Sequence, residues 1–319
     1  MGKPTLSCPV RVRCNTLHYH LHSQCRCGFN HEKGSKGCGS NMKAKFVKEK
    51  ALSFLLAFPA VILLLAFLSI ILFIGIKGLP AVNWKMLTTS VQKGGIFESI
   101  VGTLYLLAGT LLIATPLGVA TAVYLVEYAP KGRVNRIITQ ALNNLAGVPS
   151  IVFGLFGYVF FCRFLGLRIS LLSGWLTLTC MVLPIIVRGS QEALRMVPKS
   201  FREAAEALGA PKWRVIKDVV LPTATPGLAT STILGVSRVA GETAAILFTC
   251  SVFLMKGLPS TPFQPVMVLT YQLYTLLVAS PSVSFDRAFA MALVLLGVVV
   301  VLNIFAYLMR VHYRKKWKW

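Results

Sequence analysis

Long apolar stretches alternate along the chain with short polar segments that hold most of its charge. A helix that crosses a bilayer needs about 20 mostly apolar residues. Six stretches reach that length, so the pattern predicts an all-α polytopic membrane protein with six transmembrane helices. The predicted spans cover residues 51–76, 99–126, 137–162, 169–188, 223–250 and 287–309.

Composition and charge support a membrane protein. Of the 319 residues, 55% are hydrophobic and 13% are charged, whereas a soluble domain has about 25% charged residues. A net charge of +23 in a soluble protein would suggest nucleic-acid binding, but here 25 of the 33 Lys and Arg residues fall on one side of the predicted spans and 7 on the other. The positive-inside rule therefore predicts a multi-pass membrane protein with both termini and the 188–222 loop in the cytoplasm.

Residues 1–42 differ from the remainder and are rich in Cys and His. Candidate metal ligands are Cys8, Cys14, Cys25, Cys27, His18 and His20. The segment has no C-x-x-C pair, and a cytoplasmic location argues against disulfides. Three interpretations stay open: a mis-assigned start with Met42 as the true one, a disordered extension, or a metal-binding module. Residues 43–319 form the predicted permease domain.

A polar segment, residues 200–222, separates the fourth and fifth predicted spans. Ser200 and Glu203 have the spacing of a capping box at the start of a helix. Gly209 suits the end of that helix, and Pro211 suits the first position of a second one. Leu221-Pro222 is expected to end the second helix. An apolar face is predicted on each helix, formed by Phe201, Ala204, Ala205 and Leu208 on the first and by Ile216, Val219 and Val220 on the second.

Two interpretations fit this helix–turn–helix. An amphipathic loop can lie on the bilayer surface, and a short helix with small and apolar residues on one face can insert into the groove of a partner protein.

The motif in this segment favours the partner. Glu203-Ala204-Ala205, then Gly209 and Leu221-Pro222, have the spacing of the EAA motif and resemble ABC-importer permeases, with Val219 in place of the usual isoleucine. The resemblance implies the type I, MetI-like permease architecture, with residues 198–222 contacting an ATPase. The chain lacks a G-x-x-x-x-G-K-[ST] phosphate loop. The resemblance thus implies a non-catalytic subunit whose partner ATPase uses ATP and Mg.

Further segments are similar to phosphate-specific permeases of the PstA type. They cover residues 94–96, 102–104, 144–157 and 241–244, although Ala245 stands where that group commonly has proline. This resemblance implies phosphate uptake with a PstB-like ATPase dimer, a second PstC-like permease and an external PstS-like phosphate-binding protein. A permease for molybdate or sulfate, an ion-gradient-driven transporter, and a membrane scaffold or sensor remain alternatives.

Charges within the apolar stretches are rare and costly. Arg238 falls near the middle of the fifth predicted span, and Glu242 follows at i+4, close enough to pair. The pair either fixes helix packing or places Arg238 on a translocation path, where its guanidinium suits phosphate oxygens. Arg188 is expected at the cytoplasmic end of the fourth span.

The sequence also allows predictions for several uncharged residues. Glycines and a proline interrupt the third predicted span and favour close packing or local unwinding: Gly147, Pro149, Gly154 and Gly157. Asn143, Asn144 and Asn303 could form hydrogen bonds across helices, and Cys162, Cys180 and Cys250 are expected to pack. The apolar run 266–278 is too short to span and predicts a surface or re-entrant helix, a plausible docking surface for a binding protein.

Overall fold

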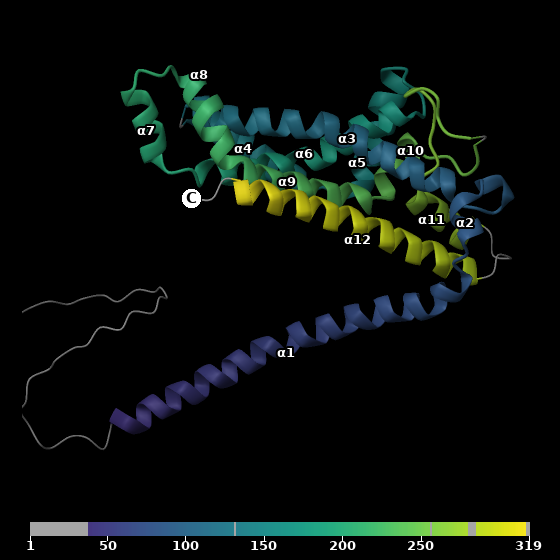
Figure 1. Ribbon diagram of the computed structural model, residues 1–319, viewed down its shortest axis with the longest axis horizontal. Coiled ribbons are helices and arrows are strands. Elements are labelled where there is room, and N and C mark those ends of the chain that lie inside the picture. The colour runs from purple at the N-terminus through teal and green to yellow at the C-terminus, as the bar shows by residue number, and fades with distance from the viewer. Residues whose placement is uncertain (1–37, 131, 256, 280–284, 317–319) are drawn as a thin grey trace, which may run out of the picture. The chain divides into compact units, whose positions relative to one another are not determined.

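The computed structural model describes residues 38–130, 132–255, 257–279 and 285–316 (Figure 1). The Cys and His residues proposed above as metal ligands lie outside these ranges. Chain contacts separate residues 1–65 from residues 66–319. In the first unit the described part is the beginning of helix α1, and the packing and the sites described below belong to the second unit.

The described part of the chain is helical and forms no strand beyond an isolated bridge between Ser251 and Val266. Three π-helical segments extend or join α-helices: η3 (Tyr124–Tyr128), η4 (Tyr158–Phe164) and η5 (Ile216–Val220). The α-helices are α1 (Cys38–Gly78), α2 (Trp84–Thr88), α3 (Phe97–Val123), α4 (Arg133–Ala146), α5 (Ser150–Gly157), α6 (Leu171–Arg195), α7 (Lys199–Ala207), α8 (Lys212–Val215), α9 (Leu221–Ala240), α10 (Ala244–Thr249), α11 (Leu269–Ala279) and α12 (Phe285–Lys316).

Among these, five continuous helical stretches are long and apolar enough to cross a membrane, and a bent pair gives a sixth. The five are Ser53–Ala81, Phe97–Tyr128, Leu171–Arg195, Lys212–Ala240 and Phe285–Leu308. They lie where five of the six spans were predicted, so the multi-pass helical fold is confirmed. The helix at the fourth predicted span, 169–188, continues to Arg195, so Arg188 lies inside α6 and not at its end.

The third predicted span, 137–162, is wrong as a continuous helix. Arg133–Ala146 and Ser150–Phe164 meet at an angle of 101°. Pro149 lacks a backbone N–H and clashes with a preceding helical turn, and Gly147 lowers the helix propensity beside it. Unwinding at 147–149 therefore accounts for the break, while close packing operates further on: a Cβ on Gly154 would lie 2.9 Å from the Ala244 carbonyl oxygen of α10.

The fifth predicted span, 223–250, is also wrong in its extent. Helix α9 ends at Ala240, and a short break at Gly241 precedes α10. The Glu242 carboxylate accepts a hydrogen bond from the Ala245 N–H (3.4 Å), which satisfies a backbone donor at the start of the new helix. Arg238 therefore lies in the last turn of α9 and not at the middle of a span.

Helix α6 forms the centre of the unit, and both α3 and α9 pack against it. Leu178, Val182 and Ile186 follow one another at intervals of four residues and are fully buried, the spacing of one helix face. The hydroxyls of Ser190 and Ser231 hydrogen-bond between α6 and α9 at 3.0 Å. Buried apolar side chains and paired hydroxyls together fix these helices against each other.

Smaller predictions about packing have mixed outcomes. Asn303 of α12 accepts a hydrogen bond from Ser237 of α9, as expected for an interhelical contact. Cys162 and Cys250 are buried, and Cys180 packs at the edge of the core. The run 266–278 forms helix α11 after a buried segment at 266–268. Asn143 and Asn144, in contrast, are exposed.

Candidate functional site

Helices α7 and α8 form the predicted helix–turn–helix and lie at one end of the bundle, the end at which α12 also finishes (Figure 1). Gly209 joins them with φ +77°, a conformation that glycine adopts without a Cβ clash. The N–H groups of Gly209 and Ala210 donate to the carbonyls of Glu206 (2.9 Å) and Ala205 (3.2 Å). This is the Schellman arrangement, so the prediction of a helix end at Gly209 is confirmed.

Other details of the predicted loop are wrong. Pro198 is the N-cap of α7, and Ser200 lies within the helix with no capping hydrogen bond, so Ser200 and Glu203 form no capping box. The Phe201 N–H donates to the Pro198 carbonyl at 3.3 Å, so a backbone acceptor serves this donor of the first turn where a side-chain cap was predicted. Pro211 is likewise the N-cap of α8 and not its first residue.

Leu221 and Pro222 do not end the second helix. The chain runs from α8 through η5 directly into α9, and the Leu221 N–H donates to the Ile216 carbonyl in the wider π pattern. A π-helical turn accommodates a local insertion in the α-helical hydrogen-bond ladder, so the proline at position 222 interrupts nothing essential. A single helical path thus connects α8 to the span that contains Arg238.

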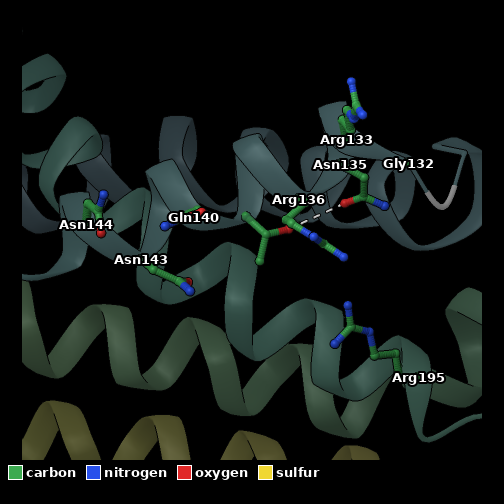
Figure 2. Close-up of a pocket in the computed structure, with 9 residues that line it drawn as sticks. Gly132, Arg133, Asn135, Arg136, Gln140, Asn143, Asn144 and Arg195 are labelled. Carbon is green, nitrogen blue, oxygen red and sulfur yellow. Dashed lines mark hydrogen bonds between the residues drawn. The ribbon is translucent and has the colours of Figure 1, made fainter.

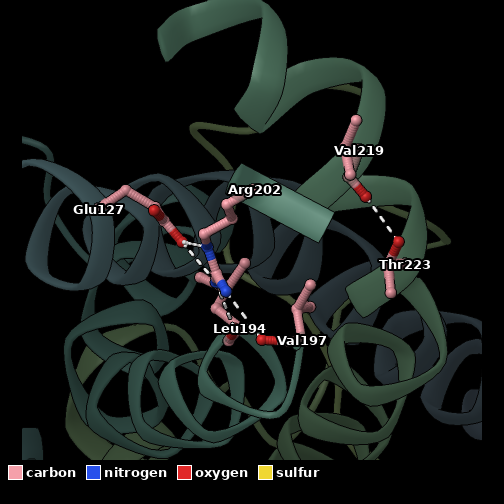
Figure 3. A network of polar contacts seen from close by, with 6 residues as sticks. All are labelled: Glu127, Leu194, Val197, Arg202, Val219 and Thr223. Atoms are coloured by element: carbon pink, nitrogen blue, oxygen red, sulfur yellow. Dashed lines mark hydrogen bonds and ion pairs between the residues drawn. The ribbon is translucent and has the colours of Figure 1, made fainter. Parts of the chain in front are cut away.

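Arg202 anchors α7 to the bundle, as Figure 3 shows. Its guanidinium forms an ion pair with Glu127 of η3 at 2.8 Å, and the two side chains are only 19% and 10% exposed. The same guanidinium donates to the carbonyl oxygens of Leu194 (2.9 Å) and Val197 (2.7 Å), at the end of α6. We call this set, Arg202 with its three partners, the loop clamp.

The loop clamp was not predicted from the sequence. Arg202 directly precedes the EAA spacing, and Glu127 ends the second span, but 75 residues separate them. The available signal was an acidic residue at the end of an apolar stretch, a position that costs free energy unless a partner neutralises it.

The predicted apolar face of α7 is divided between two surroundings. Phe201 and Ala205 pack against the cluster formed by α3, α6 and η5. Ala204 is exposed, and Leu208 is 89% exposed. Trp213 of α8 is also more than half exposed. One side of the helix pair is therefore fixed to the bundle, and the other presents apolar side chains outward.

Arg238 and Glu242 are brought together as predicted, with an Nη1–Oε2 distance of 3.5 Å. Their surroundings differ, because the Glu242 side chain is 4% exposed and that of Arg238 is 47% exposed. The Glu242 backbone carbonyl also accepts the Thr270 hydroxyl (3.0 Å), so this residue is held by α10 and α11. The carboxylate is fixed and positions a guanidinium that remains open on one side.

The described residues contain no group of three or more His, Cys, Asp or Glu side chains that could hold a metal ion. The open charged group at the helix break is the Arg238 guanidinium, and guanidinium groups bind carboxylates and oxyanions.

An all-helical bundle with a clamped helix pair at one end and an open arginine at a helix break defines a multi-pass membrane permease subunit. The model of the family described as "Binding-protein-dependent transport system inner membrane component" matches residues 114–319. The chain belongs to this family, whose members are the permease subunits of ABC transporters.

Curated relatives agree with that assignment. A probable ABC transporter permease, YqgI of Bacillus subtilis, is 39% identical over 56% of the chain; the match covers 62% of YqgI, less than two thirds of its length. The phosphate transport system permease protein PstA 1 of Mycobacterium tuberculosis is 39% identical over 68% of the chain and 70% of its own length. PstA of Xylella fastidiosa is 37% identical over 60% of the chain and 67% of its own length.

Solved structures support the fold. A chain of a bacterial ABC transporter that imports alginate superposes with a TM-score of 0.64 and 18% identity, covering 85% of this chain and 99% of that one. A chain of the inward-facing methionine transporter MetNI superposes with a TM-score of 0.55 and 18% identity, covering 73% of this chain and 99% of that one. The MetI-like permease architecture is thus confirmed.

Proposed function

We propose that this chain is the transmembrane permease subunit of an ATP-driven importer that moves inorganic phosphate across the bacterial plasma membrane. Its proposed partners are an ABC ATPase dimer of the PstB type, a second permease of the PstC type and an external phosphate-binding protein of the PstS type. ATP and Mg would be used by the ATPase, and none of this chemistry occurs on the permease itself.

The observation that supports this most directly is the helix pair α7–α8. It is held by the loop clamp on one side and presents Leu208 and Trp213 on the other. Exposed apolar side chains on a fixed short helix suit insertion into a groove of a partner. We propose that this partner is the ATPase and that residues Ser200, Glu203, Ala204, Ala205 and Gly209, with Leu221 and Pro222 at the base, form the coupling loop.

Orientation follows from the same proposal. The ATPase is cytoplasmic, so the end of the bundle with α7 and α8 would face the cytoplasm. Helix α12 finishes at that end (Figure 1), which agrees with a cytoplasmic C-terminus. The excess of Lys and Arg on that side supports the same orientation for the N-terminus. Residues 1–42 are proposed as an extension outside the permease domain.

Phosphate is favoured as the substrate because relatives at 37–39% identity are named phosphate transport system permeases. Arg238 agrees with an anionic substrate, since a half-exposed guanidinium can donate two parallel hydrogen bonds to phosphate oxygens. Glu242 would limit how tightly the anion is held, and a permeation pathway must also release what it binds.

The test uses vesicles that contain the complete reconstituted complex and the phosphate-loaded binding protein outside. Radiolabelled phosphate should accumulate only when ATP is inside the vesicles. Uptake driven by an imposed ion gradient without ATP would instead identify a secondary transporter, and no uptake would favour a scaffold or sensor. Replacement of phosphate by labelled molybdate or sulfate, each with its own binding protein, tests the other oxyanions.

A further inference from the structure

One face of α4 is polar along its whole length. Arg133, Arg136, Gln140 and Asn143 recur at intervals of three and four residues, which places them on one side of the helix. The opposite side is apolar, and Leu142 is buried there in the core that α3, α6 and η5 share. Helix α4 is therefore fixed by its apolar side and turns its polar side outward.

This polar face borders an open cavity of about 940 Å³ whose other wall is the end of α6 (Figure 2). Figure 2 shows Arg136 from α4 and Arg195 from α6 reaching into the same space. None of the nine described lining residues is acidic, and three are arginines. The others include Asn135, Thr139, Gln140, Asn143 and Asn144. The lining thus offers positive charge and hydrogen-bond donors, and the carboxylate that pairs with Arg195, that of Glu192, lies outside this lining.

The walls of the cavity are held in place by contacts on their far side. Asn135 donates to the Leu125 carbonyl (3.2 Å) and so ties the first turn of α4 to the end of the second span. Arg195 follows Leu194, whose carbonyl belongs to the loop clamp. Arg195 itself has only a loose, exposed ion pair with Glu192 at 3.6 Å, and pairs of this kind contribute little. Both guanidinium groups are thus available to a ligand.

Lipid does not suit this face. Helix α4 is one half of the bent apolar pair that counts as the sixth candidate span. Arginine and amide side chains within a span are costly against lipid tails, and they face a water-filled path or another polar surface. Guanidinium groups with neighbouring amide donors are the groups that bind phosphate oxygens in pairs.

We propose that this cavity is an oxyanion subsite on the cytoplasmic half of the pathway, at which inorganic phosphate is held before release. Arg136 and Arg195 supply the charge, and Gln140 and Asn143 supply neutral donors. The inference rests on the proposed function, which it extends from Arg238 to a second position. The site is exposed to water, so it binds weakly and favours passage over capture.

The first experiment compares Arg136→Gln/Arg195→Gln with the unaltered complex in vesicles. Loss of two charge-assisted contacts should lower the turnover of ATP-dependent phosphate uptake about tenfold or more. The apparent KM, which is set by the external binding protein, should stay unchanged. Arg163→Gln is the matched control, because Arg163 is an exposed arginine of η4 that contacts Tyr158 and not the cavity.

Each outcome has one meaning. If the unaltered complex shows no ATP-dependent uptake, the proposed function itself fails. If it transports and the double variant transports equally well, the subsite is excluded. Loss of the ATPase from the purified variant complex would show that the arginines bind that subunit, which also overturns the proposal.

A lipid headgroup presents the same phosphate chemistry, so the measurement is made in two kinds of vesicle. The subsite predicts the same defect in phosphatidylcholine vesicles and in vesicles with added phosphatidylglycerol. A defect confined to the anionic vesicles would assign the arginines to lipid and overturn the transit role.

A second measurement leaves both arginines in place. A cysteine at position 140 (Gln140→Cys) should react with a negatively charged, membrane-impermeant thiosulfonate applied to the cytoplasmic side. Phosphate in the millimolar range should slow that reaction, whereas the same concentration of chloride should not. No reaction, or a reaction that phosphate leaves unchanged, contradicts the subsite; the parent chain gives the background from its native cysteines.

Discussion

Two Arg–Glu pairs lie in different parts of this molecule and are built differently. In the loop clamp both side chains are largely buried, and the guanidinium also satisfies two carbonyl oxygens. In the pair at the end of α9 the carboxylate is buried, but the Arg238 side chain is 47% exposed and the separation is 3.5 Å. A closed pair suits a fixed connection between helices, and an open pair suits transient contact with a substrate anion.

The difference follows from what surrounds each arginine. Arg202 has three acceptors at the ends of two helices and is held in one geometry, which is the use for which a planar guanidinium is best suited. In the described part of the chain Arg238 pairs with Glu242, which lies between the break at Gly241 and the start of α10. Its exposed side remains able to meet an anion. Substitutions in the two pairs should therefore fail in different ways.

The largest effect is expected at the open pair. Arg238→Gln should abolish phosphate uptake while the complex remains assembled in the membrane, because the side chain no longer attracts the anion. Uptake of labelled phosphate and the amount of purified complex measure the two quantities separately. Normal uptake would exclude a role for Arg238 on the path.

The same substitution leaves the buried Glu242 carboxylate without its cation, which by itself is destabilising. The control is therefore Arg238→Gln/Glu242→Gln, which removes both charges. A packing role predicts that the double variant recovers the protein and the uptake together. A path role predicts recovery of the protein alone.

The closed pair should fail in its connection to the ATPase. Arg202→Ala leaves Glu127 unpaired and the end of α6 without its donor, so α7 should lose its fixed position. We expect uptake to fall about tenfold or more, since charge-assisted hydrogen bonds of this kind contribute about 1.5–3 kcal/mol each. The ATPase activity of the complex should then respond less to the loaded binding protein.

Arg202→Lys is the informative control, because lysine keeps the charge but cannot reach three acceptors in a fork geometry. It should restore only part of the coupling. Full coupling in Arg202→Ala would show that the clamp is dispensable.

The sequence was sufficient to predict the helical membrane fold because apolar length alone decides whether a helix can span. It was insufficient where two local rules competed. At residues 147–149 hydropathy continues through a proline that breaks the helix, and at Gly241 an apolar stretch continues past the end of α9. In both places the backbone properties of proline or glycine determined where the helix ends, and a hydropathy pattern does not contain that information.

The candidate site likewise has features that the sequence predicts and features that it does not. Gly209 was predictable because a helix end depends on one residue and its neighbours, and the Arg238–Glu242 pair because i, i+4 spacing is local. The loop clamp and the cavity beside α4 each join segments distant in sequence, which no local pattern specifies. Ser200 was misjudged because Pro198 already begins the helix two residues earlier.

The smallest effect on the molecule itself, and the sharpest contrast with the clamp, is expected at Leu208. Its side chain is 89% exposed, so Leu208→Ser should leave the thermal stability of the permease unchanged. If the outer side of α7 inserts into the ATPase, the same substitution should weaken ATPase binding several-fold to about tenfold, as loss of a moderate interface contact does. Titration of purified ATPase onto the permease measures this.

Val134→Ser serves as the matched control, because Val134 is an exposed apolar residue on a different helix, α4. Equal binding by the Leu208 variant would place the contact elsewhere on the helix pair, with Trp213 the next residue to test, because it is the other large apolar side chain that the loop presents outward.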